Sequence, residues 1–279
     1  MRSILAAALC FTASFASAQN NTTWPYQTYK SQPTFQPPQL NITRYGTPAP
    51  GYLFFAPAGA KSHQTAPLIT TNDGELVYQG AKNNPAFNWG VQTYLNQSVI
   101  VYWNGTIYPE PVGRGYGNVY ILDNTYSVIA NVSLPGHFVT SAGTSFASNV
   151  DLHEIYVTNR DTVLVTANNV SQTDLTSVGG PRNGWVVAGL VYEIDIKTNE
   201  VLFSWNLLDH LDQIPFSVST YPLGSEGFNA QNQSAAWGYF RKWSHDHSLN
   251  IANMNQISMR SLRSTTATSS RLATPAPRF

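Results

Sequence analysis

The residues best placed for chemistry are Asp151-Leu152-His153-Glu154, which directly precede an apolar run typical of a β-strand. Side chains alternate along an extended chain, so Asp151 and His153 are expected to point to one face, and Leu152 and Glu154 to the other. A carboxylate beside an imidazole fixes the tautomer of the ring and raises its basicity, as a general base or a nucleophile requires. The alternative is a histidine whose hydrogen bonds only stabilise the fold.

Three further motifs carry weaker chemical signals. The Gly-rich segment 113–117 lacks the Lys-Ser/Thr pair and the following helix of a phosphate loop, so we expect an ordinary loop. Asp209-His210 follows a Trp-containing strand end, and we expect a loop there as well. His245-Asp246-His247 would hold a metal only in a folded segment. The sequence has no zinc motif and no serine-hydrolase motif, so we expect no metal and no cofactor.

The elements that must position these residues are short apolar runs separated by turn residues. Asp73-Gly74 predicts a hairpin between residues 67–69 and 75–78, because a tight type I′ turn needs positive φ. We interpret Asn104-Gly105 in the same way, as a turn between Ser98–Trp103 and Thr106–Tyr108. Three more hairpins are expected, pairing residues 118–122 with 126–132, 155–157 with 163–165, and 190–196 with 201–205.

No window before Phe240 has an apolar period of helical length, so the chain is predicted to be all-β, as a sandwich, a barrel or a propeller. Similar strand pairs recur about every 40–50 residues, which favours propeller blades. We expect about three blades, over residues 52–103, 104–165 and 186–240. Together they form a partial β-propeller over residues 51–240.

The regions flanking this segment differ from it in composition. Residues 1–18 have a basic start, a short apolar run and an Ala-Ser-Ala end, as in a secretory signal peptide. That run is too short to span a bilayer, and no later stretch is longer, so we expect a secreted, extracellular protein without a membrane span. Residues 19–50 are Pro-rich and are expected to form an extended arm. Residues 241–279 are rich in Ser, Thr and Arg, which predicts a disordered basic tail.

The charge distribution and the sequons support an extracellular setting. Residues 1–240 hold 9 Lys/Arg against 14 Asp/Glu, so the expected folded part is acidic, which argues against nucleic-acid binding. Charged residues make up 11% of the chain, which is low, and N-glycans would help to solubilise such a surface. Besides Asn20 and Asn21 at the expected new N-terminus, the glycosylation candidates are Asn41, Asn96, Asn104, Asn131, Asn169 and Asn232.

From about Tyr26 to Phe240, the order of several segments resembles the fungal arylsulfotransferase (ASST-like) secreted proteins. The matching segments are Ala49–Phe54, Asp151–Glu154, Thr166–Asn168, Asp174–Gly180, Glu193–Ile196, Val201–Trp205, Leu208–His210 and Trp237–Phe240. The resemblance implies a relation to bacterial aryl sulfotransferases. Those six-bladed propellers move a sulfuryl group between phenols through a sulfohistidine, without a nucleotide donor. It also implies that His153, the catalytic candidate, faces a central channel and binds sulfate oxygens, with Asp151 and Glu154 as substrate-binding residues beside it.

The resemblance changes after Phe240. There the family continues with a His-x-Asn site motif, whereas this chain reads Arg241-Lys242-Trp243. We therefore expect a divergent or truncated C-terminus, an incomplete propeller and a protein that is inactive towards aryl sulfates and phenols. The alternatives are a non-catalytic extracellular ligand-binding propeller and a structural or adhesive protein. Open sheet edges would further predict oligomerisation or poor secretion.

Overall fold

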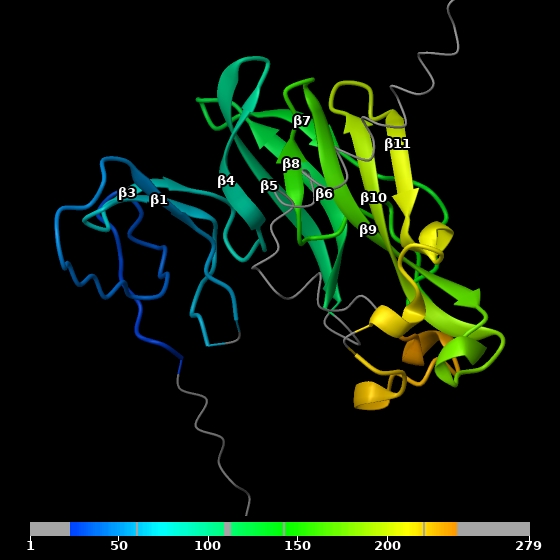
Figure 1. Ribbon diagram of the computed structural model, residues 1–279. Helices are drawn as coiled ribbons and strands as arrows, with labels where there is room; N and C mark the ends of the chain where they lie inside the picture. The colour runs from blue at the N-terminus through cyan, green and yellow to red at the C-terminus, as the bar shows by residue number, and fades with distance from the viewer. Residues whose placement is uncertain (1–22, 60, 109–112, 142, 220, 239–279) are drawn as a thin grey trace, which may run out of the picture.

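The computed structural model describes residues 23–59, 61–108, 113–141, 143–219 and 221–238, and these form three antiparallel sheets (Figure 1). The expected signal peptide and basic tail lie outside the described residues. The first sheet consists of β1 (Tyr52–Phe55), β2 (Leu68–Thr71) and β3 (Leu76–Gln79). The second consists of β4 (Phe87–Tyr94), β5 (Gln97–Tyr108), β6 (Arg114–Leu122) and β7 (Val128–Val132). The third consists of β8 (Ile155–Val157), β9 (Thr162–Thr173), β10 (Gly184–Asp195) and β11 (Val201–Asn206).

Each sheet is a meander, in which every strand pairs with the strand that precedes or follows it in the chain. The all-β prediction is therefore confirmed. The part of the chain that the structure describes has five short 3₁₀ helices and no α-helix: η1 (Thr176–Val178), η2 (Leu207–His210), η3 (Phe216–Val218), η4 (Ser225–Gly227) and η5 (Gln233–Ala235). No helix in that part is long and apolar enough to cross a bilayer.

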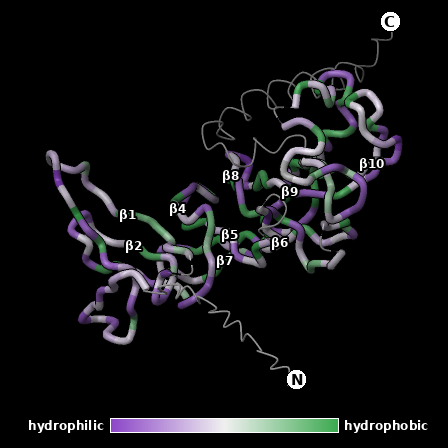
Figure 2. The backbone as a smooth tube through the Cα atoms, turned by 90° about the horizontal axis from the view of Figure 1, so that it is seen from below, coloured by the Kyte–Doolittle hydropathy of each residue, from purple (hydrophilic) through white to green (hydrophobic). Residues whose placement is uncertain are grey.

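The main core lies between the second and third sheets. Alternate residues of their strands point into it, including Val101 and Trp103 of β5 and Val163 and Val165 of β9, all fully buried. Figure 2 shows hydrophobic stretches on these strands. Trp103 also satisfies its indole N–H, which donates to the carbonyl of Val150 at 2.9 Å. The two sheets therefore share one hydrophobic core and support the segment that carries the Asp-x-His motif.

A second, aromatic core joins the first sheet to the opposite face of the second. Tyr78 of β3 stacks on Tyr126 with ring centroids 4.1 Å apart, and it also stacks on Trp89 of β4. Tyr102 of β5 stacks on Tyr120 of β6 at 5.3 Å. Burial raises the pKa of Tyr102 to about 12, with further contributions from the neighbouring tyrosines. These rings contribute through packed area and offset geometry, which accounts for part of the unusual Tyr content of the chain.

The described part of the expected extended arm turns back on itself. Tyr26 pairs with Pro38 in an isolated antiparallel bridge, and the amide of Gln39 donates to the carbonyl of Pro25 at 2.9 Å. Phe35, on the returning half of this loop, is fully buried against Ala66 and Leu68. The prolines therefore shape a folded loop that adds a small core to the first sheet.

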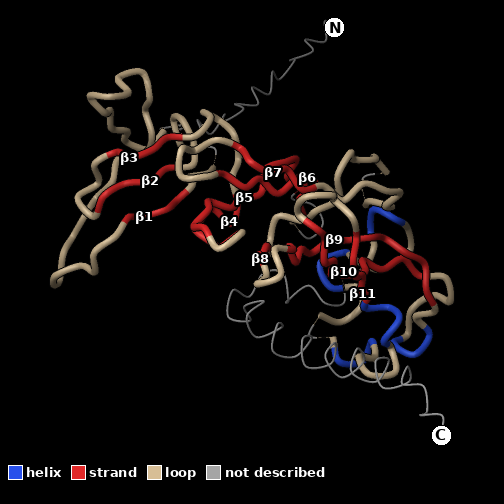
Figure 3. The backbone as a smooth tube through the Cα atoms, turned by 90° about the horizontal axis from the view of Figure 1, so that it is seen from above, coloured by secondary structure: helices blue, strands red, loops and turns tan. Residues whose placement is uncertain are grey.

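The segment after β11 packs on the third sheet. The backbone of Trp237 exchanges hydrogen bonds with Trp185 and Val187 of β10, at 2.8 and 2.9 Å. Trp237 and Phe216 then cover Leu175 and Val186 in a separate small core. Figure 3 shows the short helices beside β9, β10 and β11.

Four of the five expected hairpins are present, and the one at Asn104-Gly105 is wrong. Residues 97–108 form one continuous strand, β5, that pairs with β6 over its last nine residues. Gly105 serves close packing, because a Cβ there would lie 2.4 Å from the Cα of Gly117 on β6. The boundary expected between the first and second blades, at residue 104, therefore falls inside β5. The second sheet instead runs from Phe87 to Val132.

Candidate active site

The Asp151-His153 segment is held between the second and third sheets by backbone hydrogen bonds. The carbonyl of Val150 accepts from the amide of Gly117 on β6 at 3.1 Å. The amide of Asp151 donates to the carbonyl of Thr166 on β9 at 2.8 Å. Because these bonds fix the backbone on both sides, the side chains of Asp151 and His153 have rigid supports.

Asp151 orients the ring of His153. One carboxylate oxygen, Oδ2, accepts from His153 Nδ1 in a short hydrogen bond and from the backbone amide of His153 at 3.2 Å. The other, Oδ1, accepts from the backbone amide of Gly115 at 2.8 Å. The side chain of Asp151 is 3% exposed and that of His153 is 14% exposed. A proton held on Nδ1 by the carboxylate directs Nε2 away from Asp151, which fixes the role of each ring nitrogen.

The surroundings of His153 raise its pKa. Burial alone lowers the pKa, because it disfavours the imidazolium. The hydrogen bond of Asp151, its charge and the charge of Glu154 raise the pKa, and together they outweigh burial. Arg114 opposes them weakly through its own charge. His153 is therefore an imidazole that stays protonated to a higher pH than usual.

Arg114 is a second charged residue at this site, and the sequence analysis missed it. Residues 114–117 belong to strand β6, so the loop expected over 113–117 is wrong. The guanidinium is buried, and its Nη1 donates to Ser141 Oγ at 2.8 Å. Burial lowers the pKa of Arg114, while Tyr116 and Asp151 counteract part of that shift. The alternation of glycine with larger residues in this segment was the signal for a strand.

The glycines of this segment explain why the strand lies so close to its neighbours. A Cβ on Gly115 would lie 2.5 Å from the ring of Trp103 and 2.7 Å from Cβ of Leu152. Glycine at this position therefore lets β6 approach the Asp151-His153 segment. Beyond it, Tyr116 stacks on Phe146 with ring centroids 4.1 Å apart. This approach places the backbone of Gly115 within hydrogen-bonding reach of Asp151.

The other predicted site residues lie as follows. Glu154 is half-buried, and its charge acts on His153. His210 lies in η2 rather than in a loop, and its ring stacks on Trp205 at 5.0 Å. His245-Asp246-His247 lies outside the described residues. Among the residues that the structure describes, no three His, Cys, Asp or Glu side chains are grouped as metal ligands.

The candidate glycosylation sites differ in exposure. Asn41, Asn96, Asn131 and Asn232 are exposed. Asn169 is half-buried, and its Oδ1 accepts from the amide of Val139 at 2.8 Å. Asn104 is half-buried, and its Nδ2 donates to Asn84 Oδ1 and to the carbonyl of Pro85, both at 2.6 Å. The side-chain amides of Asn104 and Asn169 thus already take part in the fold.

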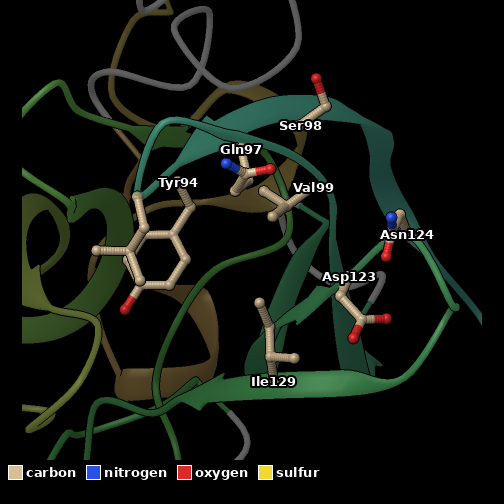
Figure 4. Close-up of a pocket in the computed structure, with 8 residues that line it drawn as sticks. Tyr94, Gln97, Ser98, Val99, Asp123, Asn124 and Ile129 are labelled. Atoms are coloured by element: carbon tan, nitrogen blue, oxygen red, sulfur yellow. The ribbon is translucent and has the colours of Figure 1, made fainter.

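A pocket of about 330 Å³ lies at the turn end of the second sheet, away from the Asp151-His153 pair (Figure 4). Tyr94, Val99 and Ile129 supply apolar walls, and Asp123 lies at the rim. The carboxylate of Asp123 is already bound by the amides of Thr125 and Ser127, at 2.8 and 3.0 Å, so it closes the turn between β6 and β7. The charged residue among those that line the pocket, Asp123, therefore serves the turn rather than catalysis.

The family model for arylsulfotransferase (ASST) matches residues 90–271. The chain therefore belongs to the arylsulfotransferase family. The matched range includes Arg114, Asp151, His153 and Glu154. It begins later than the resemblance drawn from Tyr26 and extends beyond Phe240. No curated protein and no solved structure matches the chain.

Proposed function

We propose that the Asp151-His153 site binds the sulfuryl group of an aryl sulfate ester, in an arylsulfotransferase-like protein. The observation that carries the proposal is the buried contact between Asp151 and His153 Nδ1, inside the range matched by the family model. Aryl sulfates and phenols are the substrates that membership of the family implies. The further expectations of a propeller fold and an extracellular location are part of the same proposal.

The chemistry follows from charge. The sulfuryl oxygens of a sulfate ester carry negative charge, and further charge develops on the phenol oxygen as the S–O bond breaks. An imidazolium with Asp151 on Nδ1 donates from Nε2 to such an oxygen, and a fixed donor stabilises charge without reorganising. The raised pKa of His153 keeps this donor protonated to a higher pH than an ordinary imidazole. In this scheme His153 binds the sulfuryl group, and Asp151 orients the ring.

Turnover by this chain is a separate part of the proposal. The family reaction passes the sulfuryl group through a further histidine, and the His-x-Asn motif expected after Phe240 is replaced by Arg241-Lys242-Trp243. We infer that the chain binds an aryl sulfate but does not transfer its sulfuryl group. Robust release of 4-nitrophenol from 4-nitrophenyl sulfate in the presence of phenol would contradict the inferred inactivity.

Binding is tested by isothermal titration with 4-nitrophenyl sulfate. We expect saturable binding by the unmodified chain, at least about tenfold weaker binding by His153→Ala, and unchanged binding by His137→Ala. His137 is an exposed histidine in the same connection between β7 and β8, so it controls for the loss of an imidazole. Binding that survives His153→Ala would favour the alternative of a non-catalytic binding protein with a different site.

A further inference from the structure

Two tyrosines from different sheets form a close ring stack at the surface. Tyr78 of β3 and Tyr126, in the turn between β6 and β7, have ring centroids 4.1 Å apart and ring planes only 17° from parallel. Tyr78 is half-buried, and Tyr126 is 36% exposed. Burial raises the pKa of Tyr78, and the charge of Tyr126 raises it further. The two phenols are therefore in contact with each other, and solvent reaches the pair from the side of Tyr126.

The turn holds Tyr126 over Tyr78 against its own backbone preference. Tyr126 has φ of 64°, in the left-handed region that a bulky side chain rarely adopts. Asp123 fixes the turn, because its carbonyl accepts from the amide of Tyr126 at 3.0 Å and its carboxylate accepts from the amides of Thr125 and Ser127. Backbone strain of this kind persists only where the surrounding structure imposes it. The ring of Tyr126 is therefore preorganised on its partner.

Aromatic rings are the oxidisable side chains of the described residues. Cysteine and methionine are the usual targets of oxidation. Those of this chain all lie outside the described residues: Met1, Cys10, Met254 and Met259. The ring stack continues inward from Tyr78 to Trp89, with centroids 5.9 Å apart, so a radical formed on Trp89 can pass to the tyrosine pair. At the pair, an oxidised phenol can release its proton to solvent.

We propose that Tyr78 and Tyr126 are a site of oxidative cross-linking, at which a one-electron oxidant of the peroxidase class joins the two rings by a carbon–carbon bond. Each phenol loses one electron and its hydroxyl proton and becomes a tyrosyl radical. The two radicals couple at ring carbons next to the oxygens, and each of these carbons passes its hydrogen, as a proton, to the neighbouring oxygen. The two electrons and two protons lost by the pair reduce one hydrogen peroxide to two molecules of water.

The cross-link joins the first sheet to the second. It closes the chain between residues 78 and 126, and so restricts the unfolded chain as a disulfide does. Cys10 is the only cysteine of the chain, so no disulfide within the chain can take this role. The inference goes beyond the proposed function, because it involves neither Asp151 nor His153 and no sulfuryl group.

Treatment of the dilute unmodified chain with a peroxidase and limiting hydrogen peroxide tests the assignment. We expect dityrosine fluorescence in a protein that remains monomeric on a denaturing gel and unfolds at a higher temperature than the untreated chain. After digestion with trypsin, mass spectrometry should show peptide 62–82, in which Tyr78 is the only tyrosine, joined to the peptide that contains Tyr126 with the loss of two hydrogen atoms. Cross-links found only between molecules, or only at other tyrosines, would overturn the inference.

Phenylalanine variants test whether both phenols are needed. Tyr78→Phe and Tyr126→Phe each keep an aromatic ring in the stack but remove the hydroxyl group, so each should abolish the cross-link within the molecule. Tyr45→Phe is the matched control, because Tyr45 is 98% exposed and would be the preferred target if exposure alone decided the reaction. An unchanged yield in either stack variant, or a loss of the cross-link in Tyr45→Phe, would contradict the assignment. If a variant does not fold, the peptide map of the unmodified chain decides.

Discussion

At the scale of single residues, Asp151 controls the properties of His153. It accepts the hydrogen bond from Nδ1 and so fixes the ring, and its hydrogen bond and charge raise the pKa of His153 against the lowering effect of burial. It is itself positioned by the amide of Gly115 from another strand. The basicity of His153 therefore depends on a contact between β6 and the segment before β8.

Asp151→Asn should lower the pKa of His153. The asparagine removes the negative charge but keeps a side chain of the same size, so the unfavourable effect of burial remains. A pH titration of the histidine side-chain resonances measures the change, and the other described histidines act as internal references. An unchanged His153 pKa in Asp151→Asn would show that the carboxylate does not set it.

The same pair makes the stability of the protein depend on pH. His153 has a raised pKa in the folded state, so the folded protein binds its proton more tightly than the unfolded chain does. The stability that this tighter proton binding contributes is complete below about pH 6.5, the pKa of histidine in the unfolded chain. It is lost as the pH rises through the higher pKa of His153 in the folded protein. Urea denaturation across this range should show stability falling for the unmodified chain and a flatter profile for His153→Gln. Equal profiles would contradict the linkage.

At the scale of elements, close contact between strands depends on particular glycines. A Cβ on Gly117 would lie 2.3 Å from the carbonyl oxygen of Asn104, and backbone atoms of β5 have no room to move aside. Gly117→Ala should therefore destabilise the protein by roughly 1–3 kcal/mol or more. Gly189→Ala on β10 is the matched control, because nothing lies within 4 Å of its added Cβ. Thermal unfolding of the two variants should differ clearly, with the control at or above the unmodified midpoint.

Gln92 of β4 supports the edge of β8. Its Nε2 donates to the carbonyl of Ile155 at 3.1 Å, and its Oε1 accepts from the amide of Val157 at 2.7 Å. The side chain thus bonds β8 on the edge that β9 leaves open. Gln92→Ala should destabilise the protein by about 1–3 kcal/mol and speed hydrogen exchange at Val157. The exposed Gln97 provides the control, and equal exchange in both alanine variants would contradict this role.

The sequence predicts most hairpins because their turns need specific residues. Gly74 has φ of 81° in the turn between β2 and β3, as expected for Asp-Gly. The same reasoning failed at Asn104-Gly105, because glycine also permits close approach between strands, and only the register with Gly117 distinguishes the two uses. β4 was missed because its turn is Leu95-Asn96, both at positive φ, without the glycine that marks such turns.

The candidate site was predictable only in part. For residues that are close in sequence, such as Asp151 and His153, the spacing alone predicts the contact. Arg114 is 37 positions before Asp151, and it reaches the site only because β6 lies against the segment before β8. Side chains that meet through the pairing of distant strands leave no local pattern, so sequence reasoning could not place Arg114 beside His153.

At the scale of the whole molecule, each sheet ends in a strand with exposed apolar residues. Tyr52 on β1, Val128 on β7 and Leu202 on β11 are 60%, 55% and 50% exposed. Exposed apolar edges favour pairing between molecules, so we expect association that rises with concentration. Leu202→Lys should weaken it, measured by sedimentation velocity. Asn124→Lys adds the same charge at an exposed turn and should leave association unchanged. A monomer at all concentrations would contradict this prediction.

The hydrogen bonds of Asn104 set an order of events for a chain that enters the secretory route. Its amide is free for glycan transfer only until β5 settles against residues 84–85, because afterwards Nδ2 is bound to Asn84 and Pro85. Glycan transfer and folding then compete for the same atom. A glycan at Asn104 would mark a molecule that was modified before β5 took its place. The fraction of molecules with a glycan at Asn104 would thus report how fast the second sheet folds relative to glycan transfer.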